Sequence, residues 1–196
     1  MTAALLALAL GSIPFGYLIG RTFYGRDIRA SGSGNIGAAN ALRTFGRGGA
    51  ALVLVLDAAK GFVPVFVALD VSHGGYALAG WVALLAVLAH CYTPWLHFKG
   101  GKGVATWLGA LFALDWVAGL AFVAAWIAVA LPTRFASLAS LVATAASAVL
   151  LGALHPATAL AGGATAVLIF WKHRENIVRL REGRESRIAR TPGKPP

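Results

Sequence analysis

The stretch FASLASLVATAASAVLLGALHPATALAGGATAVLIFW, residues 135–171, carries no charged side chain over 37 residues. A helix that crosses a bilayer needs about 20 mostly apolar residues, so this run is too long for one crossing and fits two. Its best division is GALHP at 152–156, because glycine favours helix ends and proline favours helix starts. The stretch therefore predicts two transmembrane helices, near 136–152 and 156–171.

The remainder of the chain has the same character, with 58% hydrophobic residues, 12% charged residues and 24 glycines among 196 residues. A soluble domain carries about 25% charged residues, so a soluble protein is excluded. Further apolar runs lie near 3–20, 50–69, 76–96, 103–114 and 116–131. The run at 103–114 is short for a crossing, and we expect its neighbours to shield it. We predict an all-α polytopic membrane protein of about seven spans, with 1–196 forming a single membrane-embedded domain.

The basic residues are segregated under this division. Sixteen of the 17 lysine and arginine residues fall in loops on one side or in the C-terminal tail, and the remaining one, Lys60, lies inside a span. Cytoplasmic loops collect lysine and arginine. We therefore expect the N-terminus outside and the C-terminus in the cytoplasm.

Three polar, glycine-rich segments lie on the predicted cytoplasmic side, at 31–40, 98–106 and 173–185. Glycine lets backbone N–H groups approach an anion closely, and a helix N-terminus adds favourable electrostatics. The cations and amides available to such a site are Arg43, Lys102, Asn35 and Asn176. Any one segment could be an ordinary turn between helices. Three on one side indicate an anion site suited to phosphate.

Several common mechanisms are excluded by the motifs. Gly103 follows Lys102 where a nucleotide P-loop requires serine or threonine. No serine lies in a Gly-x-Ser-x-Gly elbow, and no histidine begins the His-x-x-x-x-Asp pattern of acyltransferases that use acyl-CoA. The single cysteine, Cys91, excludes a cysteine metal site, and a packed histidine is favoured over a metal pair at His90. We expect no metal and no cofactor.

The segments GSGNIG at 32–37, FKGGKGVAT at 98–106 and HRENIVRLREGRE at 173–185 resemble the three signature motifs of bacterial acyl-phosphate-dependent glycerol-3-phosphate acyltransferases. The similarity extends over essentially the whole chain. Two positions depart from the family pattern: Ala39 replaces a threonine, and Ala89 replaces a glycine before His90. The first departure removes a hydroxyl that could contact phosphate.

The resemblance implies transfer of a fatty acyl group from acyl phosphate to the 1-hydroxyl of glycerol 3-phosphate, the first acylation of phospholipid synthesis. The products would be lysophosphatidic acid and phosphate, formed at the cytoplasmic face of the bacterial cytoplasmic membrane. It implies catalytic roles for Lys102, His173 and Asn176. It implies substrate-binding roles for Ser33, Gly34, Asn35, Asn40, Arg43, Gly100, Gly101, Gly103, Thr106 and Glu185. The partners would be the two substrates and the lipid bilayer, without nucleic acid. No protein general base is implied, and a phosphate oxygen of a substrate could take the proton.

Asp57 and Lys60 place two charges inside one predicted span. Their i, i+3 spacing allows them to pair on one helix face. We expect them to support the anion site, and a purely structural pair is the alternative. The six tryptophans are expected to anchor the protein at the membrane interfaces.

Two other functions could use the same features. A transporter of an organic phosphate would also need basic loops, but transport favours a site at the membrane midplane on broken helices. A scaffold that binds anionic partners through its basic tail would leave the glycine-rich segments without a purpose. Acyl transfer accounts for more of the sequence than either.

Overall fold

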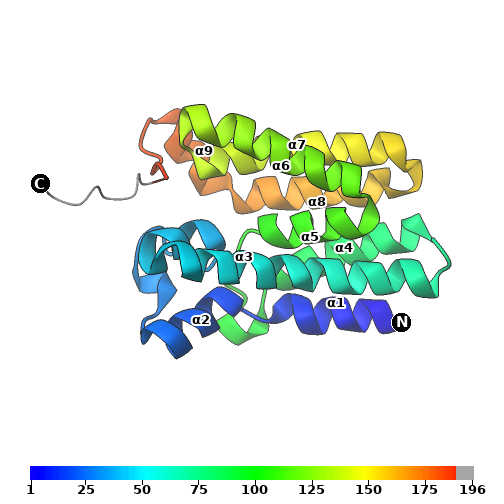
Figure 1. The fold of residues 1–196 in the computed structure, drawn as a ribbon, viewed down its shortest axis with the longest axis horizontal. Coiled ribbons are helices and arrows are strands. Elements are labelled where there is room, and N and C mark those ends of the chain that lie inside the picture. The colour runs from blue at the N-terminus through cyan, green and yellow to red at the C-terminus, as the bar shows by residue number, and fades with distance from the viewer. Residues whose placement is uncertain (189–196) are drawn as a thin grey trace, which may run out of the picture.

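The apolar segments form helices that run side by side along the long axis of the molecule, as Figure 1 shows for the computed structural model, which describes residues 1–188. In chain order the α-helices are α1 (Thr2–Ser12), α2 (Phe15–Tyr24), α3 (Ala38–Val71), α4 (Tyr76–Cys91), α5 (Val104–Leu114), α6 (Trp116–Thr133), α7 (Ala136–Leu154), α8 (Ala159–Lys172) and α9 (Arg174–Arg181). Short 3-10 helices lie between them: η1 (Ile28–Ala30), η2 (Pro94–Leu96) and η3 (Pro156–Thr158). Residues 1–188 contain no strand, which confirms the predicted all-α class.

All seven predicted apolar segments are helical, but they differ in length. Four are long and apolar enough to cross a bilayer: α3, Tyr76–Leu96, α6 and α7. The pair α1 and α2 gives a fifth if it is counted as one crossing. In contrast, α5 has 11 residues and α8 has 14, fewer than the roughly 20 residues that a full crossing needs. The count of seven complete crossings therefore stays a prediction.

The first predicted span, at 3–20, is not continuous. A bend of 42° separates α1 from α2, at a point where Pro14 has no N–H to continue the helical ladder. At the break the backbone carbonyl of Ile13 accepts hydrogen bonds from Phe15 N–H at 3.1 Å and from Lys60 Nζ on α3 at 2.8 Å. A buried cation in the second predicted span thus stabilises the break in the first.

The short helix α5 lies at the centre of the bundle. Helices α3, α4, α6 and α7 all pack against it, which confirms that its neighbours shield the segment 103–114. Its contact with α3 is close, because a Cβ at Gly61 would overlap the carbonyl of Thr106. On its other side Trp107 Nε1 donates to Ser147 Oγ on α7 at 3.1 Å. This packing fixes the position at which α5 begins, directly after Gly103 of the second glycine-rich segment.

The bundle has two chemically different ends. Segments 25–37 and 173–188 lie at the left in Figure 1, and segment 97–103 lies further in, nearer the middle of the view; we call these three segments the site end. At the right, the loop 72–75 and the turn 155–158 form the opposite end, which also includes Asp115 through its contact with His155. Arg190 and Lys194, which contribute to the predicted charge segregation, lie outside the described residues.

Candidate active site

The first glycine-rich segment is built around the buried side chain of Asn40. Its Nδ2 donates to three backbone carbonyls in segment 28–35 at 2.8–3.0 Å, and its Oδ1 accepts the backbone N–H of Ser33 at 2.8 Å. Gly32 has a φ of +61°, and a Cβ there would overlap Asn40 Oδ1. The Asn40 amide is therefore occupied by the loop. This geometry gives Asn40 a role in shaping the segment that presents Ser33 and Asn35, while its direct contact with substrate stays a prediction.

The second glycine-rich segment folds back against the end of α4. Gly100 N–H donates to the Cys91 carbonyl and Gly101 N–H donates to the His90 carbonyl, each at 3.2 Å. A Cβ at Gly100 would overlap the His90 carbonyl, and one at Gly101 would overlap the His90 imidazole. Close approach to α4 therefore requires both glycines. Gly103, with a φ of +82°, then begins α5 as its N-cap residue.

Lys102 extends from this segment to the third motif. Its Nζ donates to Asn176 Oδ1 on α9, and Asn176 Nδ2 donates to Glu185 Oε1 at 2.7 Å. The Glu185 carboxylate also accepts from Ser137 Oγ at 2.7 Å and from Arg179 Nε at 2.8 Å. An amide thus lies between the ammonium group and a carboxylate that already pairs with arginine. The charge of Lys102 remains available to an anion.

His173 lies at the junction of α8 and α9. Its Nδ1 donates to the Ile169 carbonyl at 2.8 Å, so Nε2 is the nitrogen without a proton when the ring is neutral. Burial, and after it the charge of Lys102, lowers the pKa of His173 to about 4. The ring is therefore neutral at pH 7.

The other charged groups at this end keep their charge at neutral pH. Burial lowers the pKa of Lys102 to about 8, against the opposing influence of the Glu185 carboxylate. Burial alone would raise the pKa of Glu185, but hydrogen bonds from Arg179, Ser137 and Asn176 bring it below its ordinary value. With Arg179 paired to Glu185, the ammonium of Lys102 gives this cluster a positive charge.

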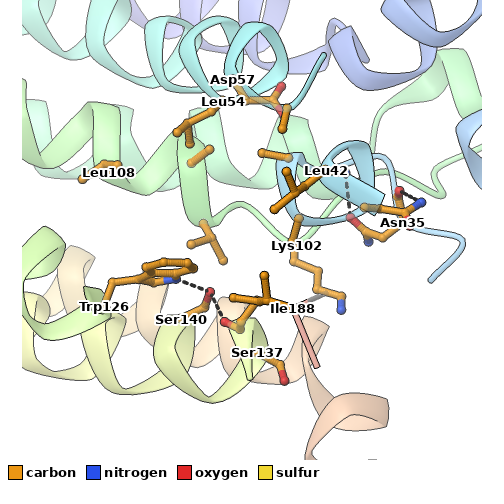
Figure 2. Close-up of a pocket in the computed structure, with 18 of the residues that line it drawn as sticks. Asn35, Leu42, Leu54, Asp57, Lys102, Leu108, Trp126, Ser137, Ser140 and Ile188 are labelled. Atoms are coloured by element: carbon orange, nitrogen blue, oxygen red, sulfur yellow. Dashed lines mark hydrogen bonds between the residues drawn. The ribbon is translucent and has the colours of Figure 1, made fainter. Parts of the chain in front are cut away.

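A cavity of about 490 Å³ extends from this cluster into the bundle. Its polar end is lined by residues of all three motifs: Ser33, Asn35, Asn40, Arg43, Lys102, Gly103, His173, Asn176 and Glu185. Apolar side chains of α3, α5 and α6 line the remainder: Leu54, Leu108, Phe122, Val123, Trp126 and Ile127. Figure 2 shows Lys102 and Asn35 on one side and Leu108 and Trp126 on the other. Leu54 and Ile127 are also 42% and 45% exposed, so the apolar part reaches the outer surface of the bundle.

Some predicted site residues do not line this cavity: Gly34, Lys60, Gly100, Gly101 and Thr106. Thr106 is fully buried on α5, so it is not placed for the substrate contact expected of it. Asp57 does line the cavity, and it pairs with Lys60 at 2.9 Å, as the i, i+3 spacing predicts. Lys60 Nζ also donates to the Ile13 carbonyl at the break between α1 and α2. Both of its contacts are with the protein, which favours a supporting role over contact with substrate.

Sequence reasoning missed other residues of the cavity wall, among them His90, Ser137, Trp126 and Ile188. Trp126 Nε1 donates to Ser140 Oγ at 3.1 Å, with its ring in the apolar wall. The expectation of interfacial tryptophans is wrong for Trp126 and for the buried Trp107. Their positions in the middle of the predicted spans were the available signal. Among residues 1–188 no group of His, Cys, Asp and Glu side chains is arranged to hold a metal ion.

Comparisons with known proteins agree with this arrangement. The family model for glycerol-3-phosphate acyltransferase matches residues 1–183. A glycerol-3-phosphate acyltransferase of Erythrobacter litoralis is 47% identical, over 97% of this chain and 95% of its own length. One of Nitrobacter winogradskyi is 49% identical, over 91% of each chain.

Solved structures give the same result. The crystal structure of PlsY, an integral membrane glycerol 3-phosphate acyltransferase, in its glycerol 3-phosphate form superposes with a TM-score of 0.91 at 38% identity, over 96% of this chain and 94% of that one. Its lysophosphatidic acid form superposes with a TM-score of 0.88, over 95% and 93% of the two chains. The resemblance seen in the motifs is confirmed, and the chain belongs to the glycerol-3-phosphate acyltransferase family as an integral membrane acyltransferase.

Proposed function

We propose that this protein transfers a fatty acyl group from acyl phosphate to the 1-hydroxyl of sn-glycerol 3-phosphate, giving 1-acylglycerol 3-phosphate and inorganic phosphate. The observation that carries the proposal is one cavity with two chemically distinct parts. The polar end, with Lys102 and Arg43, suits phosphate groups. The apolar part, between Leu54 and Trp126, suits a fatty acyl chain, and its opening on the lipid-facing surface lets that chain come from the bilayer.

The chemistry requires little from the protein beyond alignment and charge. The 1-hydroxyl oxygen attacks the acyl carbonyl carbon, the bond from that carbon to the phosphate oxygen breaks, and phosphate leaves. Lys102 and Arg43 stabilise the negative charge as it moves from the carbonyl to the leaving phosphate. His173 orients the glycerol through its unprotonated Nε2. Because the pKa of His173 is about 4, a substrate phosphate oxygen is the better acceptor for the hydroxyl proton.

The properties of phosphate as a leaving group also support acyl phosphate as the acyl donor. A leaving phosphate needs no protonation by an acid, and the mixed anhydride is already activated toward attack. The sequence has no His-x-x-x-x-Asp pair of the kind that acyl-CoA enzymes use to deprotonate the acceptor. We therefore assign acyl phosphate, and not acyl-CoA, as the donor.

The membrane placement belongs to the same proposal. Lysine and arginine gather at the site end, and this asymmetry marks the cytoplasmic side of a bacterial inner membrane. We place residues 1–196 in that membrane as one domain of seven spans, with the N-terminus outside. Glycerol 3-phosphate would then reach the polar end from the cytoplasm.

The decisive experiment uses purified protein in proteoliposomes with radiolabelled glycerol 3-phosphate. Palmitoyl phosphate should give labelled lysophosphatidic acid, whereas palmitoyl-CoA should give none. A matched variant, Thr144→Val, removes a buried hydroxyl on α7 that does not line the cavity and should retain full activity. Equal product from both donors would contradict the assigned donor. Uptake of label into the vesicles without product would favour the transporter.

A further inference from the structure

We propose that His90 is a positioning residue that holds the segment 97–103 so that Lys102 reaches across the cavity. The inference rests on the proposed function, in which Lys102 contacts phosphate. It gives a purpose to two buried groups at the cavity wall, His90 and Asp57, and to Lys60, which pairs with Asp57.

The imidazole of His90 lies between a carboxylate and the Lys102 segment. His90 is 3% exposed, and its Nδ1 lies 3.8 Å from Asp57 Oδ1 without a hydrogen-bond partner among the described residues. On its other side the ring fills the space next to Gly101, where an added Cβ would come within 3.1 Å of Cδ2 and closer still to Nε2. Any shift of this ring therefore moves the backbone that precedes Lys102.

The carboxylate of Asp57 is itself held in place by contacts with the helices of the bundle. Asp57 pairs with Lys60 at 2.9 Å, and Lys60 donates to the Ile13 carbonyl at the break between α1 and α2. A buried ion pair is weak evidence for stability, because desolvation offsets the attraction. Here the pair gives His90 a rigid neighbour on α3. A chain of contacts thus runs from the helix break through Asp57 and His90 to Gly101.

The backbone of the segment depends on the same helix end. Gly100 and Gly101 form their hydrogen bonds with the carbonyls of Cys91 and His90, and Lys172 Nζ also donates to the Cys91 carbonyl at 3.1 Å. The end of α4 is therefore the platform on which the Lys102 segment lies. Within that platform, His90 contacts the segment through both its side chain and its carbonyl.

The first test compares two substitutions of similar size. His90→Leu fills the space but cannot make a polar contact with Asp57, whereas His90→Gln retains hydrogen-bonding atoms. Misplacement of a catalytic group by about 1 Å can cost about 100-fold in rate. We expect His90→Leu to lower kcat about 100-fold and His90→Gln to recover most of that loss, with melting temperatures that match each other. Thr144→Val, another buried polar substitution, should leave kcat unchanged.

The second test begins with a variant that keeps the His90 ring and displaces the segment 97–103. Gly101→Ala adds a methyl group that overlaps the His90 imidazole, and it should lower kcat by a similar factor. The double variant His90→Ala with Gly101→Ala removes the overlap. His90→Ala and Gly101→Ala act on one contact. The fall in kcat of the double variant should therefore be much smaller than the product of the falls measured for these two single variants. This test does not depend on the stability of the leucine variant.

The outcomes separate this inference from the proposed function. If wild type forms product and the leucine and glutamine variants have equal kcat, His90 is packing only and the inference is overturned. Losses that multiply in the double variant would overturn it as well. If wild type makes no product from acyl phosphate, the proposed function fails, and with it the role assigned to His90.

Discussion

The two ends of the bundle both bring charged side chains together from distant parts of the chain, but they use them differently. At the opposite end, Asp115 Oδ1 caps α6 by accepting the N–H groups of Val117 and Ala118 at 2.7 and 3.2 Å. Its Oδ2 bonds His155 Nε2 at 2.8 Å, and the His155 ring stacks on Tyr76 with centroids 3.9 Å apart. Both carboxylate oxygens have protein partners, so this cluster is complete without a ligand.

At the site end the corresponding cluster is incomplete. The Lys102 ammonium has three donor hydrogens, and the hydrogen bond it makes to residues 1–188 goes to the neutral Asn176. This ammonium lines a cavity, whereas no cavity residue comes from the Asp115 cluster. The comparison indicates that the partly exposed Asp115–His155 pair at one end stabilises the fold, whereas we propose that the buried Lys102 at the other end binds an anion.

The largest contrast between the ends should be their accessibility in intact cells. Single cysteines are introduced as His73→Cys at the opposite end and Arg181→Cys at the site end, both exposed positions, while the native Cys91 is buried. A membrane-impermeant thiol reagent should label the first variant and not the second, because the proposed topology places the site end in the cytoplasm. Labelling of both from outside would contradict the proposed placement of the two ends.

Next in size is the effect of removing the ammonium group of Lys102. Loss of a donor directed at developing charge costs about 10²–10³ in rate, so Lys102→Ala should nearly abolish acyl transfer. Lys102→Arg should recover little, because a planar guanidinium does not fit a place shaped for a compact ammonium. Rates are measured with palmitoyl phosphate after melting curves have established folding. A folded alanine variant with more than about a tenth of wild-type rate would remove Lys102 from the phosphate site.

The pKa of Lys102 predicts a dependence on pH that the opposite end does not share. The ammonium loses its proton as pH rises through about 8, so kcat/KM, which reports the free enzyme, should fall about tenfold per pH unit above that value. The measurement covers pH 6.5 to 9.5 with correction for hydrolysis of the donor. Arginine stays protonated in this range, so the residual activity of Lys102→Arg should lack this decrease. A flat wild-type profile up to pH 9.5 would show that the ammonium is not required.

The smallest effect is expected at the opposite end. Asp115→Ala removes the N-cap of α6, which costs about 0.5–2 kcal/mol, together with a partly exposed pair worth at most about 1 kcal/mol. The variant should unfold at lower temperature or lower denaturant concentration, while kcat per folded molecule remains that of wild type. A large loss of kcat without loss of stability would mean that this end also takes part in catalysis.

Much of the difference between the two ends could be predicted from the sequence. Long apolar runs indicate the membrane-spanning helices, and the segregation of lysine and arginine indicates which loops share one end. The loops were harder, because what a polar side chain contacts depends on tertiary structure. Asn40 is of a residue type that often binds ligands, yet its amide nitrogen donates hydrogen bonds to backbone carbonyls. Gly100 and Gly101 have the pattern of a phosphate loop, yet α4 occupies the space beside them.

The break between α1 and α2 shows the same limit in a different way. Pro14 signals a bend, but nothing local indicates that Lys60, 47 positions away, donates a hydrogen bond to the carbonyl of Ile13. The apolar wall formed by Trp126 was also hidden, because tryptophan in a membrane protein is more often interfacial. Pairs distant in the chain therefore account for most of what the sequence did not reveal.

The most direct test of the account is the affinity for glycerol 3-phosphate, measured by calorimetry without donor, for wild type, Lys102→Ala and Asp115→Ala. A charge-assisted hydrogen bond is worth about 1.5–3 kcal/mol, which corresponds to a loss of about 10- to 150-fold in affinity. We expect that loss for Lys102→Ala and wild-type affinity for Asp115→Ala. Equal affinity in all three proteins would contradict the claim that the site end, through Lys102, holds the phosphate.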